Sequence, residues 1–284
     1  MYPKPPPFSE FGFSILICCS KVTLSVNATS HRLTHLFKMA ESSSMSPKPG
    51  SKMLGSDHSS TASPLPYTEV VVVRHGETEW NADGRLQGHL DVLLNDTGRQ
   101  QAAAVANRLS KEPKIAAIYS SDLKRALTTA EIIAASCGGL EVVEDGDLRE
   151  RHLGQLQGLV LRDTAKVNPE AYQAFLSRRT SQDIPGGGES LDQLYLRSTS
   201  SLQRIARKHR GERVVVVTHG GVIRALYRRA CPNKKPAGKI LNTSVNVFQI
   251  IDGGKWVVKV WGDVSHLNQT EYLDSGFGGD GTSG

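Results

Sequence analysis

The sequence predicts an α/β protein, a three-layer α/β/α sandwich with a mostly parallel central sheet. Short runs of apolar β-branched residues, typical of strands buried on both faces, alternate along the chain with segments of helical period. Two of these runs, at 68–73 and 213–217, each contain four consecutive valines. Alternation of strands and helices places helices on both faces of one sheet.

The first half of this pattern holds three strands and two helices. They are expected, in chain order, at 68–73, 96–111, 115–119, 122–136 and 140–143. Apolar residues in the first helix recur every three or four positions, and Asp96 or Thr97 can cap its N-terminus. Ser121 or Asp122 can cap the second helix, which Gly138 can end.

The second half holds two helices, a central strand and a closing hairpin. They are expected at 189–209, 213–217, 221–230, 245–251 and 255–261. Leu191, Leu194 and Leu202 share one face of the long first helix. Asp252-Gly253-Gly254 suits the turn of the hairpin, and Gly186-Gly187-Gly188 suits a turn before the long helix.

A His-Gly pair follows each of the two valine runs. Arg74-His75-Gly76 comes after the first run and Thr218-His219-Gly220 after the second. In open α/β sheets, ligands bind just beyond the carboxyl ends of the strands. One histidine in such a place is more often structural, but two in the same arrangement favour a functional site to which both strands contribute.

The residue types at this site suit phosphoryl transfer. His75 is the candidate nucleophile, because a neutral imidazole attacks phosphorus and can carry a phosphoryl group. The transferred group needs positive charge around its equatorial oxygens. Arg74 adjoins the nucleophile, and Arg125 in the first turn of the 122–136 helix can direct its guanidinium at the same anion. His219 can donate a further hydrogen bond.

Glu150 is the candidate proton donor for the leaving oxygen. A free Glu side chain has a pKa of ~4.3, so the site would have to raise this pKa toward neutrality for the role. Taken alone, Glu150 could instead lie on a surface loop, and Arg125 on a solvated helix face.

Four sequence blocks occur in an order typical of a known family. They are Arg74–Asn81, Ser120–Ala126, Leu148–Gly154 and Thr218–Gly221. Together they resemble the signature blocks of the histidine phosphatase superfamily, which includes cofactor-dependent phosphoglycerate mutases and many small phosphatases. The resemblance covers roughly residues 68–264 and is strongest to plant phosphoglycerate mutase-like proteins.

This resemblance implies a phosphoglycerate mutase-like fold and a phosphohistidine intermediate on His75. The family's proton donor matches Glu150, and its phosphate-contacting asparagine matches Asn81. The implied catalytic residues are His75, Glu150 and His219, and the implied substrate-binding residues are Arg74, Asn81, Arg125, Arg151 and Gly220. Neither a metal nor a cofactor is expected.

The short segment from Gly158 to Gly188 favours hydrolysis over isomerisation. Family mutases carry an insertion here that supplies extra cations, whereas this segment holds only Arg162, Lys166, Arg178 and Arg179. Val160-Leu161 also replaces the Asn-Lys pair of the family's mutases. A small cap lets water reach a phosphohistidine. The expected function is therefore metal-independent hydrolysis of small phosphomonoesters, such as phosphorylated sugars or sugar acids.

Two alternative functions stay open from the sequence. The first is a cofactor-dependent phosphoglycerate mutase. The second, from another class, is a catalytically idle phosphoryl-binding or scaffold protein. Such proteins usually lose the nucleophile or an arginine, whereas this chain retains both the candidate nucleophile and the arginines.

Composition divides the 284 residues into three predicted regions. Residues 1–66 are rich in Ser and Pro without sustained periodicity, which is typical of a disordered extension or a targeting segment. Residues 67–264 form the predicted histidine phosphatase catalytic domain, and 265–284 a Gly/Ser-rich tail. Met39 is an alternative natural start within the first region.

Charge and cysteine content constrain partners and compartment. A net charge of +6, about half of it in residues 1–66, is too mild to predict nucleic-acid or membrane partners. The expected partner is a small phosphorylated metabolite, and oligomeric state is not predicted. Cys18, Cys19, Cys137 and Cys231 show neither metal spacing nor a disulfide framework, which favours the cytoplasm. A chloroplast or mitochondrial location is the alternative if residues 1–66 are a transit peptide.

Overall fold

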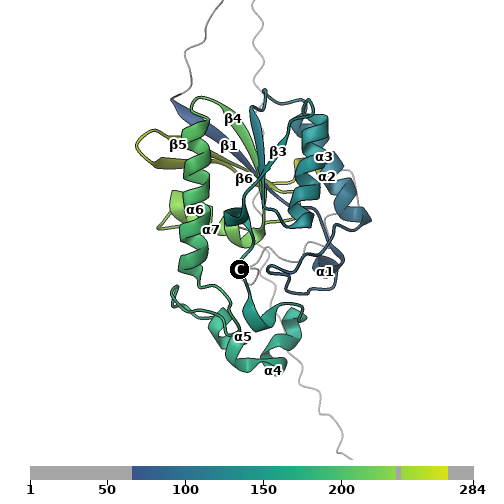
Figure 1. Ribbon diagram of the computed structural model, residues 1–284, viewed down its shortest axis with the longest axis vertical. Helices are drawn as coiled ribbons and strands as arrows, with labels where there is room; N and C mark the ends of the chain where they lie inside the picture. The colour runs from purple at the N-terminus through teal and green to yellow at the C-terminus, as the bar shows by residue number, and fades with distance from the viewer. Residues whose placement is uncertain (1–65, 235–237, 268–284) are drawn as a thin grey trace, which may run out of the picture. The chain divides into compact units, whose positions relative to one another are not determined.

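A computed structural model of the protein describes residues 66–234 and 238–267. The predictions for residues 1–66 and for most of 265–284 therefore lie outside the described residues. Six strands form one sheet in the order β3-β2-β4-β1-β5-β6 (Figure 1). The strands are β1 (Tyr67–Arg74), β2 (Ala117–Ser120), β3 (Val142–Glu144), β4 (Arg213–Thr218), β5 (Val245–Ile251) and β6 (Lys255–Asp263).

The sheet is mostly parallel, as predicted. Strands β3, β2, β4 and β1 run parallel to one another, and β5 and β6 add an antiparallel edge. In the central pair, Arg74 of β1 lies beside Thr218 of β4. His75 and His219 therefore leave the sheet at the same level and at the same carboxyl edge.

Helices cover both faces of this sheet (Figure 1). One face packs against α2 (Asp96–Leu109) and α3 (Lys124–Ser136), and the other against α6 (Leu191–Lys208) and α7 (Gly220–Ala230). Successive side chains of a strand point to opposite faces of the sheet. Val70 and Val72 of β1 therefore pack under α6 and α7, and Val71 and Val73 under α2 and α3. The predicted three-layer sandwich is confirmed.

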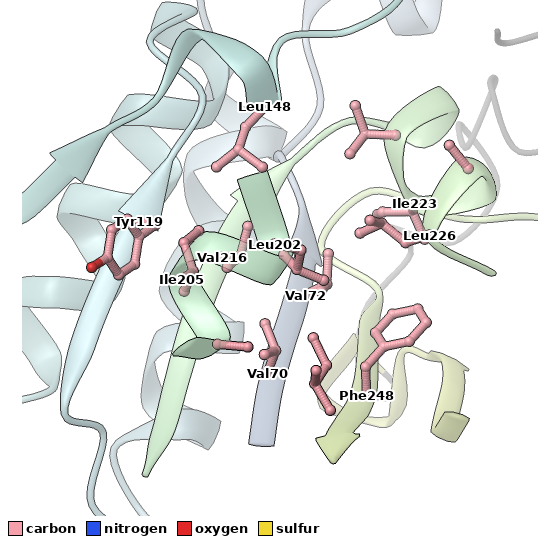
Figure 2. Close-up of a cluster of buried hydrophobic side chains, with 14 of the residues drawn as sticks. Val70, Val72, Tyr119, Leu148, Leu202, Ile205, Val216, Ile223, Leu226 and Phe248 are labelled. Atoms are coloured by element: carbon pink, nitrogen blue, oxygen red, sulfur yellow. The ribbon is translucent and has the colours of Figure 1, made fainter. Parts of the chain in front are cut away.

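Figure 2 shows one of the two apolar layers. Val70 and Val72 of β1 and Val216 of β4 face Leu202 and Ile205 of α6. All five side chains are buried. This layer holds α6 firmly against the sheet, which matters below because α6 also reaches the functional site.

The short elements gather at one end of the sheet (Figure 1). They include α1 (Glu79–Ala82), α4 (Thr164–Val167), α5 (Pro169–Phe175) and the 3₁₀ turns Gly146–Leu148, Gly154–Leu156 and Leu161–Asp163. A separate apolar cluster holds α5 and the neighbouring loops together as a small cap: Leu86, Leu153, Leu156, Ala171, Phe175 and Ile184. Within the described residues, no helix is both long enough and apolar enough to cross a membrane.

The predicted N-caps of the first two long helices are wrong. Asn95 caps α2, since its side-chain oxygen accepts a hydrogen bond from the Gly98 nitrogen at 2.7 Å. Helix α3 begins at Lys124, and no side chain caps it from its own N-cap position. The two predicted caps make other contacts: the Asp122 carboxylate accepts from the Arg149 guanidinium, and the Ser121 hydroxyl accepts from the Leu123 nitrogen at 3.3 Å. Instead, the Lys124 nitrogen donates to Asp91 across the loop, at 2.7 Å.

The described structure continues for three residues past the predicted end of the domain at 264. Residues Ser265–Leu267 form a 3₁₀ turn that packs on the domain instead of belonging to a separate tail. His266 lies 3.2 Å from the Thr243 hydroxyl through its Nε2 atom, and Leu267 is buried. The packed domain therefore extends at least to Leu267.

Candidate active site

The loop after β1 holds His75 at the carboxyl edge of the sheet. The His75 nitrogen donates to the Thr218 carbonyl at 2.9 Å, and the Gly76 nitrogen donates to the Thr129 hydroxyl of α3 at 3.1 Å. Only glycine fits at position 76, because a Cβ atom there would lie 2.4 Å from the carbonyl oxygen of Gly98. Close backbone packing therefore sets the position of the loop.

The His75 imidazole is oriented and neutral. Its Nδ1 lies 2.6 Å from the Gly76 carbonyl oxygen, and only a protonated Nδ1 can donate to that acceptor. The Nε2 atom is then unprotonated and can act as a nucleophile. Burial, followed by the charges of Arg125 and Arg74, lowers the pKa of His75 well below its usual range. The ring therefore stays neutral at pH 7.

Two buried arginines supply positive charge beside His75. Burial lowers the pKa of Arg74 and of Arg125 to about 10, so both are still charged at pH 7. The Arg125 guanidinium donates to the carbonyl oxygens of Leu90 at 2.8 Å and Gly88 at 2.7 Å. Such carbonyl contacts fix the guanidinium in place without neutralising its charge.

His219 follows β4 and lies beside His75, with 5.1 Å between the ring centroids. Its Nε2 atom is 2.9 Å from the Ser121 hydroxyl oxygen, and its buried Nδ1 has no hydrogen-bond partner within the described chain. Burial, with Arg125 as the next cause, lowers the pKa of His219 far below its usual range. When Ser121 donates to Nε2, the neutral ring carries its proton on Nδ1 and can give a hydrogen bond to a bound anion.

Glu150 has the environment that a proton donor requires. Burial raises its pKa, against the opposing effects of two backbone hydrogen bonds and of Arg125 and Arg74. Its carboxylate oxygens accept from the nitrogens of Arg151 at 2.8 Å and Gly221 at 3.1 Å. The direction of the shift is the one that the sequence analysis required.

Most of the expected site residues share one cavity of about 40 Å³, which has room for roughly three water-sized groups. Its lining includes five of them: Arg74, His75, Asn81, Arg125 and Glu150. The Asn81 Oδ1 atom is occupied by Thr78, so its Nδ2 amide is the group that can donate to a ligand. His219 is not among the lining residues, and its ring lies against the His75 ring.

Two expected substrate contacts are not in the cavity lining. Gly220 begins α7, and the Arg151 side chain donates through Nε to the Glu189 carbonyl at 2.9 Å. Arg151 is buried, and it is not among the residues that line the cavity. The Arg151 side chain therefore has a contact within the protein, and its expected contact with substrate stays a prediction.

Several residues of the site carry no clear signal in the sequence. Arg85, Leu86, Gln87, Gly88 and Leu153 line the cavity and come from loops without periodicity. A second group supports the nucleophile loop from behind. Asn242 donates to the His75 carbonyl at 3.0 Å, and the Thr243 nitrogen donates to the Arg74 carbonyl at 3.0 Å.

The described residues contain no cluster of three or more His, Cys, Asp or Glu side chains that could hold a metal ion. The positive charge of the cavity comes from arginine side chains, and its reactive groups are an imidazole and a carboxyl. This set can bind a phosphoryl group, attack it and protonate a leaving oxygen.

Comparison with known proteins agrees with this geometry. The family model for branch 1 of the histidine phosphatase superfamily matches residues 70–264. The chain belongs to the histidine phosphatase superfamily. Among its relatives within the superfamily, phosphoglycerate mutase-like protein 4 of Arabidopsis thaliana is 68% identical, over 77% of this chain and 95% of the relative.

Two further histidine phosphatases bear on the enzyme class. The metal-independent phosphoserine phosphatase of Arabidopsis thaliana is 55% identical, over 75% of this chain and 89% of its own. A solved mycobacterial glucosyl-3-phosphoglycerate phosphatase is 32% identical, with a TM-score of 0.60, over 68% of this chain and 98% of its own. The predicted class, a phosphoglycerate mutase-like hydrolase, is confirmed.

Proposed function

We propose that this histidine phosphatase hydrolyses small phosphomonoesters through a phosphohistidine on His75, without a metal ion. One observation carries the proposal: a buried neutral imidazole shares a cavity with two charged arginines and a carboxyl group of raised pKa. Phosphoryl transfer needs a nucleophile, positive charge around the phosphoryl oxygens and a proton donor. The imidazole, the arginines and the carboxyl group supply these in turn.

The first step transfers the phosphoryl group to the protein. The Nε2 lone pair of His75 attacks phosphorus, the bond from phosphorus to the ester oxygen breaks, and Glu150 gives its proton to the departing oxygen. Arg74 and Arg125 stabilise the charge on the equatorial oxygens. The products are a free alcohol, a phosphohistidine and the Glu150 carboxylate.

The second step restores the enzyme. The Glu150 carboxylate takes a proton from a water molecule as that water attacks phosphorus, and the phosphorus–nitrogen bond breaks. Inorganic phosphate leaves, while His75 regains its Nε2 lone pair and Glu150 its proton. The Gly76 carbonyl accepts from Nδ1 throughout, which keeps the ring in one tautomer.

The cap supports hydrolysis over isomerisation. Its four cations, Arg162, Lys166, Arg178 and Arg179, are exposed, and none lines the cavity in the described structure. A mutase must retain a phosphorylated acid and rebind it in a second pose, which takes additional positive charge and exclusion of water. Apart from Arg85, the described lining adds no cation to Arg74 and Arg125.

The cavity lining favours substrates that carry a carboxylate. Arg85 contributes a cation there, and the buried Gln87 Oε1 atom has no hydrogen-bond partner within the described chain. An acceptor of this kind suits a hydroxyl or an ammonium group of the substrate. Phosphorylated sugar acids and phosphoserine share these features, and the names of two relatives point to the same chemistry.

The test is a turnover assay with trapping of the intermediate. Wild-type protein in excess chelator should release phosphate from p-nitrophenyl phosphate, 3-phosphoglycerate and O-phospho-L-serine, compared by kcat/KM. His75→Ala should abolish both turnover and acid-labile labelling, because no other group of the cavity lining is a neutral imidazole. Label that remains in a folded His75→Ala variant would place the nucleophile elsewhere.

The same assay decides between the alternatives. Conversion of 3-phosphoglycerate to 2-phosphoglycerate faster than its hydrolysis, with stimulation by 2,3-bisphosphoglycerate, would establish a mutase. Binding of inorganic phosphate without turnover of any ester would establish a phosphoryl-binding protein.

The cellular setting is proposed on composition alone. We place the protein in the cytoplasm and in carbohydrate metabolism, with a chloroplast or mitochondrion as the alternative if residues 1–66 direct import. Microscopy of the full chain with a fluorescent protein at its C-terminus tests the location, and removal of an N-terminal segment on import would favour the organelle.

A further inference from the structure

An ion pair that the reaction scheme does not use lies next to the Glu150 loop. Arg197 of α6 donates through Nε and Nη2 to both carboxylate oxygens of Glu189, at 2.7 and 2.8 Å. The two side chains are only 16% and 20% exposed. A two-point contact of this kind fixes the plane of the guanidinium as well as its position.

The remaining donors of Arg197 all reach the backbone of the Glu150 loop. Nη1 donates to the carbonyl oxygens of Asp147 at 2.8 Å and Arg149 at 2.7 Å, and Nη2 donates to the Glu150 carbonyl at 2.7 Å. One side chain on a helix that is anchored to the sheet therefore holds three carbonyl groups of one loop.

Glu189 holds the same loop on the other side of Glu150. Its second carboxylate oxygen accepts from the His152 nitrogen at 2.8 Å, and its own backbone nitrogen donates to the His152 carbonyl at 2.8 Å. The ion pair thus contacts the backbone both before and after the candidate proton donor.

These contacts matter because the loop has no regular structure of its own. Glu150 lies between two 3₁₀ turns and belongs to no helix or strand. Its carboxylate is held by two backbone nitrogens, one from Arg151 in the loop itself and one from Gly221 in α7. Movement of the loop backbone would therefore move the carboxyl group relative to the cavity.

We propose that Arg197 and Glu189 position Glu150 for proton transfer and act on the reaction through it. This inference rests on the proposed function, in which Glu150 is the acid. A displacement of about 1 Å can lower the rate of a positioned step by ~10²-fold. Loss of the pair should therefore slow reactions that need the proton and spare those that do not.

The experiment compares two leaving groups in the full-length protein. The alkyl substrate is O-phospho-L-serine or 3-phosphoglycerate, whichever the wild type hydrolyses faster, since its alkoxide needs protonation. The aryl substrate is p-nitrophenyl phosphate, whose phenolate leaves with little help. The variants are Arg197→Ala and Arg197→Lys, because lysine keeps the charge but cannot make the planar multiple contact.

Arg204→Ala is the matched control. Arg204 lies two helical turns further along α6 and pairs with the side chains of Asp145 and Asp147, but it is 54% exposed and holds none of the three carbonyls. Its removal should leave both activities near wild type.

We expect Arg197→Ala to lower kcat on the alkyl substrate by ~10²-fold and on the aryl substrate by less than about 10-fold, with little change in KM. Added guanidinium ion should restore part of the alkyl activity. If Arg197→Ala does not fold, Arg197→Lys tests the proposal in its place. It should likewise lower kcat on the alkyl substrate more than on the aryl substrate. Equal losses on both substrates, wild-type activity, failure of guanidinium to act, or an equal effect of Arg204→Ala would overturn the proposal.

Glu150→Gln separates this inference from the proposed function. If Glu150→Gln itself slows both substrates equally, the assignment of the acid fails and Arg197 has nothing to position. If Glu150→Gln is selective for the alkyl substrate and Arg197→Lys is not, the assignment of the acid stands and the positioning role fails.

Discussion

Gly98, in the first turn of α2, supports the nucleophile loop by direct backbone contact. A Cβ atom at this position would lie 2.0 Å from the carbonyl oxygen of Glu77 and 2.6 Å from its nitrogen. A Cβ atom at Gly76, the preceding residue of the loop, would lie 2.4 Å from the Gly98 carbonyl oxygen. Helix and loop thus touch with no side chain between them, directly beside His75.

We expect Gly98→Ala to displace the loop. An ordinary Cβ contact begins at 3.4 Å, so a Cβ at 2.0 Å forces a relative movement of about 1.4 Å. Because the atoms that clash belong to the backbone, the overpacking cost should be at the upper end of its usual range, about 3 kcal/mol. The higher helix propensity of alanine offsets about 1 kcal/mol of that cost. The free energy of unfolding should therefore fall by about 2 kcal/mol, and kcat by ~10²-fold, through movement of His75.

Urea denaturation and phosphatase assays on the same preparation test both numbers. Gly146→Ala is the control, because no atom lies within 4 Å of its Cβ site and its φ is not in the left-handed region. If Gly98→Ala matches Gly146→Ala in stability and in kcat, the close packing of the loop on α2 does not hold His75 in place.

Three further predictions concern charge and protons in the cavity. Arg125→Ala and His219→Ala should each lower kcat by about 10²–10³-fold, the usual scale for one preorganised donor; near-normal rates would remove them from the site. Glu150→Gln should slow alkyl phosphates steeply and p-nitrophenyl phosphate only slightly. Burial lowers the pKa of both His75 and His219, so below about pH 6.5 the unfolded chain binds protons before the folded one does. The free energy of unfolding should therefore fall between pH 7 and pH 5, and the double variant His75→Gln/His219→Gln should show a flatter dependence in urea titrations.

The positions of the central strands are the feature of the fold that the sequence predicts most directly. Burial on both faces of a central strand leaves a continuous valine run, which is visible without any knowledge of the partner strand. Strand ends were predicted within about two residues for β1 and β4, and the parallel register then brings His75 and His219 together. The candidate nucleophile and the cation next to it were therefore readable from local pattern alone.

Contacts between distant loops were not readable in this way. Asn95 could not be told from Asp96 or Thr97 as the cap of α2, since all three are good capping residues and backbone geometry selects one. Asp122 pairs with Arg149, which lies 27 residues away, and does not cap α3. Arg85 and Gln87 reach the cavity on loops whose course follows no periodic pattern.

By itself the sequence determined the order of strands and helices, the edge of the sheet that carries the site, and the residue types that can transfer a phosphoryl group. These follow from periodicities of two and 3.6 residues and from the chemistry of single side chains. Only the tertiary structure decided which carboxyl group is dehydrated, what the Arg151 side chain contacts and what holds the Glu150 loop. Burial, pKa and loop position arise from groups that folding brings together from far apart in the chain, and local sequence does not record them.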